Sequence, residues 1–202
     1  MSHYVKFTYQ RARPDIAPFD GLAELNACRR KLVQRRLIGL DANGIGFGNL
    51  RVRDGASGNF YITGSATGGL PELTPTDCVR VVGFDFAKNW LRYEGAAIPS
   101  SESLTHAAIY QSDPTISAVI HCHDSVLWRT RLDRVPTTSK AIAYGTPEMA
   151  YEIMRLFTVS DVRSREIFVM AGHEGGIVTF GKNLEDAFDV VMRERRESSP
   201  CI

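Results

Sequence analysis

The sequence lacks a long hydrophobic run, a paired-cysteine motif and an excess of charge of either sign. No apolar stretch approaches the roughly 18 residues of a membrane-spanning helix, and the N-terminal MSHYVKFTYQRARPD mixes charged and aromatic residues where a secretory signal would be apolar. The four cysteines are scattered and form no CxxC motif, which predicts free thiols in a reducing compartment. These absences predict a cytoplasmic protein that neither spans nor binds a membrane.

The charge balance gives no reason to expect nucleic acid as a partner. Lysine and arginine total 24 and aspartate and glutamate 23, for a formal net charge of +1. Basic clusters occur at residues 29–31, at residues 35–36 and at Arg193, Arg195 and Arg196, each in an expected helix beside acidic or apolar residues. We interpret them as solvated helix faces rather than as a nucleic-acid-binding stripe.

The chain of 202 residues, 44% of them hydrophobic, fits a single domain over residues 1–202 with a core at about 20–195. Apolar periodicity and capping residues predict helices over 21–39, 99–113, 145–157 and 183–197, and a short helix before residue 78. Alternating and apolar runs predict strands over 48–54, 58–63, 78–85, 89–95, 116–123, 165–173 and 175–181. The order favours an α/β fold with a mostly antiparallel sheet covered by helices.

Three of the five histidines are candidates for a metal site. His121 and His123 are two apart in a predicted strand, so they share one face at a spacing of about 7 Å, and Cys122 between them faces the other way. His173 ends another predicted strand, at the rim of the sheet. An HxH pair alone is as consistent with chance as with ligands. Together with the separate strand-end histidine it favours a divalent first-row metal, zinc first, otherwise manganese, cobalt or iron.

Other polar residues near these histidines are candidates for binding and proton transfer. Glu102 lies in the first turn of a predicted helix, with His106 one turn later on the same face. Asp124, at the end of the strand that carries the HxH pair, is placed to orient a histidine ring. Ser100 and Ser101 stand at the helix N-terminus, where free N–H groups favour an anion, although a helix cap is the simpler explanation.

Seven stretches of the chain resemble, in order, signatures of the class II aldolase/adducin family: GFGNLRVR, YITG, ELTPTDCVRV, IPSSESLTHAAIY, AVIHCHDS, AYGTPEMA and GHEGGIVTFGKNLEDAF. The resemblance covers about residues 20–195. It implies a three-layer α/β/α domain on a central, mainly antiparallel sheet, a divalent metal, usually zinc, and a homotetramer with sites at subunit boundaries. Members of this family act in carbohydrate metabolism as sugar-phosphate aldolases, epimerases, dehydratases and decarboxylases, whereas the adducin branch is a non-catalytic assembly module.

The resemblance also implies roles for individual residues. The residues that would bind the metal are His121, His123 and His173. Glu102 would be the catalytic acid/base beside the metal, and His106 would stand behind the ligands without binding the ion. The residues that would hold a substrate phosphate, called the anion cradle below, are Asn49, Ser65, Ser100 and Ser101.

Three departures from the family pattern argue against the family's usual phosphosugars. The stretch between His123 and AYGTPEMA is short and holds no aspartate that matches the second base of the epimerases. The chain ends soon after its last helix, without the tail that carries a tyrosine in some aldolases. Glu174 replaces the glycine that commonly follows the distal histidine, either as a surface residue or as an acid of the site.

We therefore expect a metal-dependent lyase that forms or cleaves a carbon–carbon bond in a small hydroxy-carbonyl compound, through an enediolate stabilised by the metal. A dehydratase or decarboxylase on the same metal site is the alternative within enzymes. A non-catalytic, adducin-like assembly module is the alternative outside them. Retention of the three histidines and Glu102 argues against that last class.

Overall fold

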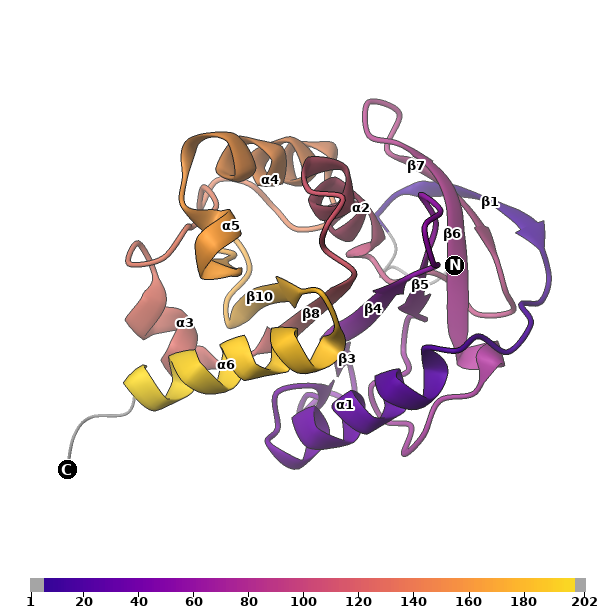
Figure 1. Ribbon diagram of the computed structural model, residues 1–202, viewed down its shortest axis with the longest axis horizontal. Helices are drawn as coiled ribbons and strands as arrows, with labels where there is room; N and C mark the ends of the chain where they lie inside the picture. The colour runs from indigo at the N-terminus through magenta and orange to yellow at the C-terminus, as the bar shows by residue number, and fades with distance from the viewer. Residues whose placement is uncertain (1–5, 199–202) are drawn as a thin grey trace.

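The computed structural model describes residues 6–198, and most of the described strands form one large sheet (Figure 1). Within these residues the strand order is β1-β7-β6-β5-β4-β8-β10-β9, beside a separate two-stranded hairpin of β2 and β3. The strand bounds are β1 Thr8–Arg13, β2 Gly39–Leu40, β3 Gly46–Phe47, β4 Asn49–Arg53, β5 Phe60–Thr63, β6 Cys78–Asp85, β7 Trp90–Glu94, β8 Ala118–His123, β9 Ile167–Val169 and β10 Gly176–Gly181.

The sheet is mixed, because β1 runs parallel to β7 while the pairs from β7 across to β9 are antiparallel. The α/β class expected from the sequence is confirmed. The hairpin expected between residues 48 and 63 is present as the antiparallel pair β4–β5. The strand with the HxH pair, β8, lies between β4 and β10 and is therefore fixed by hydrogen bonds on both sides.

Helices pack against both faces of the sheet (Figure 1). One face is covered by α2 Ser103–Ser112 and α4 Pro147–Val159, with the short α5 Val162–Arg165 beside them. The other face is covered by α1 Leu22–Gln34, α3 Ser125–Arg131 and α6 Leu184–Ser198. A 3-10 turn, η1 Pro75–Asp77, leads into β6. No described helix is long and apolar enough to cross a membrane.

The alternation of β8 divides the core and sets the direction of its histidines. Val119 packs with α2 and α4, whereas Ile120 and Cys122 pack with α1 and α6, and all three are fully buried. Burial of a side chain such as Val or Ile contributes about 1.5–3 kcal/mol, so a register slip of one residue would be costly. His121 and His123 therefore lie on the α2/α4 face, at the strand end where that core opens.

Helix boundaries follow the capping signals at some ends and depart from them at others. Thr146 caps α4 through its side chain, and Pro147 occupies the first position, as expected. The expected serine cap of α2 is wrong, because Glu102 is the N-cap residue and makes no side-chain cap hydrogen bond. The helix expected to continue to residue 39 ends at Gln34, because Arg36 adopts a left-handed conformation (φ 56°) that turns the chain back toward the core.

Five elements had no prediction: β1, α3, α5 and the two strands of the hairpin, β2 and β3. β1 is almost wholly exposed, so it lacks the alternation that marks a half-buried strand. α3 is seven residues long, too short for a periodic pattern. The hairpin of β2 and β3 has two residues in each strand. Cys28, Cys78 and Cys122 are buried free thiols, as predicted, and Cys201 lies outside the described residues.

Candidate metal and substrate site

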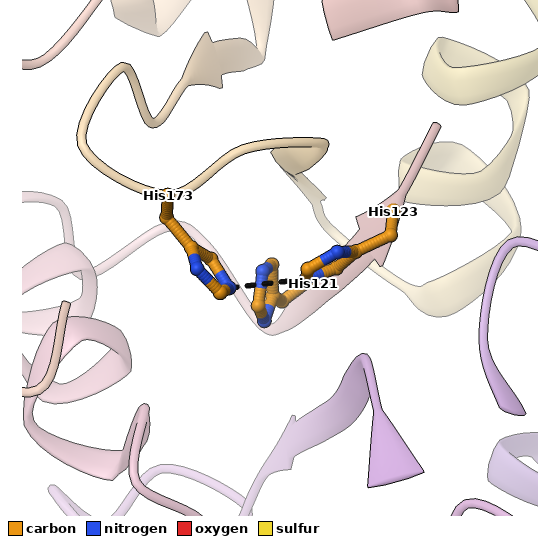
Figure 2. A group of neighbouring side chains, drawn as sticks. All are labelled: His121, His123 and His173. Atoms are coloured by element: carbon orange, nitrogen blue, oxygen red, sulfur yellow. Dashed lines mark hydrogen bonds between the residues drawn. The ribbon is translucent and has the colours of Figure 1, made fainter. Parts of the chain in front are cut away.

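The three predicted histidines converge. One ring nitrogen from each of His121, His123 and His173 lies within 4.8 Å of the other two. Figure 2 shows their rings pointing toward one another, two from β8 and the third from the loop before β10. The Nε2 atoms of His123 and His173 are 3.0 Å apart (dashed line), and the three ring centroids are separated by 4.6–5.3 Å.

The local sequence around His173 explains how the loop reaches the strand. Gly176 pairs with His123 in the register of β8 and β10. Because Gly176 has no side chain, the ring of His173 can lie against its backbone. A Cβ at Gly176 would lie 2.8 Å from the His173 ring. Gly175 has φ +80°, a conformation that favours glycine, and it lies beside the His123 ring. The GHEGG motif is thus a turn that brings two imidazoles together.

Burial holds the three imidazoles neutral. It lowers the pKa of His123 to about 4 and, with help from the charges of His123 and Lys6, lowers the pKa of His173 to about 3. The pKa of His121, which is almost fully buried, is shifted well below its ordinary value by burial first and by the neighbouring histidines second. A metal requires imidazole nitrogens without a proton, so the cluster is in the binding form at neutral pH.

Asn49 connects the histidines to the anion cradle. It faces His121 across the β4–β8 pair, and its amide lies 3.3 Å from His121 Nδ1 and 3.2 Å from Ser100 Oγ. The Asn49 Oδ1 atom has no partner and is buried. The Asn49 amide can be turned over, which exchanges its oxygen and nitrogen and leaves the shape of the side chain unchanged. The amide oxygen then accepts a hydrogen bond from a protonated Nδ1 of His121, and the unprotonated Nε2 of the same ring is available to bind a metal.

Glu102 is buried at the start of α2 and lines the same pocket as the histidines. Burial raises the pKa of its carboxyl to about 7, against smaller opposing effects of the Thr105 hydroxyl and the Lys6 charge. Neither carboxylate oxygen has a well-formed hydrogen bond within the described residues. A buried acid with a pKa near neutrality suits proton transfer in either direction.

The anion cradle lies around the same opening. One pocket of about 990 Å³ is lined by Asn49, Ser65, Ser100, Ser101, Glu102 and the three histidines. The Ser65 backbone N–H donates to Ile98 (2.7 Å), which joins the loop after β5 to the segment before α2. Ser100 and Ser101 precede the first turn of α2 rather than cap it.

Two of the predicted residues do not line the site as ligands: His106 lies behind it, close enough to His121 to influence the pKa of that ring, and Asp124 is engaged by other groups. His106 is buried within α2, neither of its ring nitrogens has a partner among the described residues, and it does not line the pocket. Its pKa is far below the ordinary value because of burial and the nearby Arg51 charge. The Asp124 carboxylate caps α3 by accepting from Val126 and Leu127 N–H groups and pairs with Arg195 at 2.8 Å, so these groups, rather than a histidine ring, hold it.

Two residues near the site had no prediction. Tyr144 lines the pocket, and its ring centroid is 4.3 Å from that of His173. Lys6 donates to the Tyr144 carbonyl (3.1 Å), and its ammonium lies 3.4 Å over the Tyr144 ring. Tyr144 stood in the resembling AYGTPEMA stretch without an assigned role, whereas no local pattern marks Lys6, which is 138 residues away. Glu174 is exposed on the pocket rim, 3.8 Å from Arg129.

Comparisons with known proteins agree with this geometry. A family profile described as the class II aldolase and adducin N-terminal domain matches residues 23–193. An L-fuculose 1-phosphate aldolase structure is 27% identical, with 91% of this chain and 84% of that chain covered and a TM-score of 0.68. A sugar-phosphate aldolase from Thermotoga maritima (16% identity, 89% and 92% covered, TM-score 0.66) and an L-fuculose-1-phosphate aldolase from Thermus thermophilus (19%, 90% and 98%, 0.55) share the fold.

Proposed function

Because the chain belongs to the class II aldolase and adducin family, we propose that it is a metal-dependent lyase that cleaves or forms a carbon–carbon bond in a small hydroxy-carbonyl substrate of the sugar-phosphate type. The observation that carries the proposal is the convergence of three neutral imidazoles beside an acid with a pKa near neutrality. An assembly module would gain nothing from this arrangement, because burying these groups without a ligand costs free energy.

The donor set fits a divalent metal. The buried Nε2 atom of His121 has no partner among the described residues, and it faces two imidazoles that are close enough to share an ion. Three nitrogen ligands with further positions open are typical of catalytic zinc, and we propose zinc. When bound, the metal supplies a Lewis acid for the carbonyl and hydroxyl oxygens of the substrate.

Glu102 is proposed to move the proton. With a pKa of about 7 it is partly ionised at neutral pH, so it can take a proton from a substrate hydroxyl or carbon and return it later. Its position at the start of α2, in the pocket that the histidines line, brings it to the reacting end of a bound substrate. Its burial excludes water that would compete for the proton.

The anion cradle is proposed to hold the phosphate of the substrate. The Asn49 amide, the hydroxyls of Ser65, Ser100 and Ser101 and the backbone N–H groups around them are neutral donors suited to an oxyanion. An anchored phosphate would hold the rest of the substrate at a fixed distance from Glu102. The reacting atoms would then be oriented toward the carboxyl that moves the proton.

Metal content is the first test. We expect about one metal ion per chain in untagged protein and none in a His121→Ala/His123→Ala variant. Cys122→Ala, on the opposite face of the same strand, is the matched control and should keep the ion. Activity in a screen of small hydroxy-carbonyl substrates, phosphorylated ones among them, should then follow the metal content. Native protein that takes up no metal even after reconstitution would refute the lyase proposal and favour an assembly role.

Two wider properties are proposed with the function. We propose a homotetramer of single-domain chains, as is frequent in the family. We also propose a cytoplasmic location, which is supported by the free thiols of Cys28, Cys78 and Cys122. Light scattering of the zinc-loaded protein tests the first property directly.

A further inference from the structure

The pocket continues past the histidines to the C-terminal end of α1. Its volume of about 990 Å³ is at the upper end of the roughly 300–1,000 Å³ typical of small-molecule sites, so it has room beyond a short phosphosugar. The lining at this end includes Arg35 and Arg36. Both side chains are exposed, as the interpretation of this basic pair as a solvated face predicts, and they also line the pocket.

Arg36 is held next to the metal-binding strand by the backbone. It follows the C-cap residue of α1 in a left-handed conformation, and the next carbonyl, that of Leu37, accepts the His123 N–H at 2.8 Å. The left-handed position after a helix usually takes glycine or asparagine. An arginine there is fixed at its Cα relative to the histidines, while its guanidinium stays exposed.

The side chain of Arg36 has no partner within residues 6–198. Its guanidinium makes no hydrogen bond or ion pair with any described residue. Arg35 is engaged by the Lys31 carbonyl (2.9 Å) and lies over the Phe188 ring, and Arg195 pairs with Asp124.

The carboxylates at this end of the pocket are engaged elsewhere. Asp41 accepts two backbone N–H groups of its own loop, those of Asn43 and Ile45, at 2.9 and 2.8 Å. Glu174 lies 3.8 Å from Arg129. Of the three arginines that line the pocket, Arg36 is therefore the one whose guanidinium has no hydrogen bond or ion pair with a described residue.

We infer that the α1 end of the pocket binds a carboxylate of the substrate and that Arg36 is the specificity-determining residue for it. The inference rests on the proposed function, in which the anion cradle takes the phosphate at the other end. A guanidinium matches a carboxylate through two parallel hydrogen bonds. The Arg36 guanidinium, which has no partner among the described residues, is available to make both bonds. The substrate class is then a short phosphorylated hydroxy-carbonyl acid, with its two anionic groups on opposite sides of the histidines.

Two probes that differ in one group test this inference. Erythronate 4-phosphate carries a carboxylate where erythritol 4-phosphate carries a CH2OH group, and neither has a carbonyl to react. Calorimetric titration of the zinc-loaded protein should give binding of the acid about tenfold or more tighter than that of the alcohol. Arg36→Met should abolish that preference and leave the affinity for the alcohol unchanged, and Arg36→Lys should keep part of it. Arg134→Met, which removes an exposed arginine outside the pocket lining, is the matched control and should retain the full preference.

The outcomes separate this inference from the proposed function. Equal affinities of the native protein for the two probes would overturn the carboxylate site while leaving the lyase and its anion cradle in place. A preference for the acid that survives in Arg36→Met would also overturn it, because the carboxylate would then bind elsewhere. Failure of both probes to bind the zinc-loaded protein would overturn the proposed anion cradle and this inference with it.

Discussion

The buried carboxyl of Glu102 should make the stability of the metal-free protein depend on pH in a direction opposite to that of most acids. Its pKa is about 7 in the folded chain against an ordinary value of 4.5, so between these values the folded state holds a proton that the unfolded state has released. The unfolded state binds fewer protons there, and the free energy of unfolding falls as pH rises. Above pH 7 the full penalty, about 3 kcal/mol, is present.

Glu102→Gln removes the ionisation while keeping the shape of the side chain. Between pH 5 and pH 8 the native protein should lose about 2.5 kcal/mol relative to this variant. The measurement is urea unfolding of chelator-treated protein at several pH values, with the difference between the two proteins taken at each pH. The difference cancels the contribution of the histidines, which titrate in both proteins. Curves that stay parallel from pH 5 to pH 8 would refute the assignment of a raised pKa to Glu102.

The histidines should make the stability depend on pH in the opposite direction, because burial lowers the pKa of His123 from 6.5 to about 4 and that of His173 from 6.5 to about 3. The free energy of unfolding of the metal-free protein should therefore fall as pH drops below 6.5. His173→Gln should lessen that loss, which urea unfolding at pH 7 and pH 5 would measure. Equal losses in both proteins would contradict it. Arg36→Gly should raise the free energy of unfolding by about 1 kcal/mol, because glycine relieves the left-handed backbone, and a destabilised variant would show that the arginine stabilises the fold. Thr146→Ala should cost about 1 kcal/mol by removing the cap of α4, which thermal unfolding would detect; an unchanged midpoint would argue against the cap.

The parts of the site that were predictable from the sequence depend on local periodicity. The two-residue repeat of a strand is enough to put His121 and His123 on one face and Cys122 on the other, and β8 has that arrangement. The strand predicted to end at His173 stops at Val169, and His173 lies in the loop that leads to β10, although the glycines that follow it indicated the turn. The family resemblance, which rests on the order of the motifs along the chain, added Glu102 and the anion cradle to the predicted site. The roles of these residues stay predictions.

The remaining features depend on contacts between distant segments, which periodicity cannot reveal. The pairing of Asn49 with His121 is a matter of register between β4 and β8, 72 residues apart. The contact of Lys6 with Tyr144 joins an exposed N-terminal segment to the pocket. The orientation of Arg36 follows from one backbone angle, which a run of basic residues at a helix end does not indicate.

The way the histidines are held has a consequence for the biosynthesis of the protein. Strand register and backbone hydrogen bonds position them: His173 N–H donates to Met170, and Gly176 N–H donates to the His173 carbonyl. The sheet therefore does not need an ion as a template, unlike small zinc-dependent domains that are unfolded without metal. At about 5–20 residues per second, His173 is synthesised roughly 3–10 s after His123, and β10 must still pair with β8. We expect metal to be loaded after the sheet has closed, so an overproduced protein should be isolated folded and partly metal-free whenever the supply of metal lags behind translation.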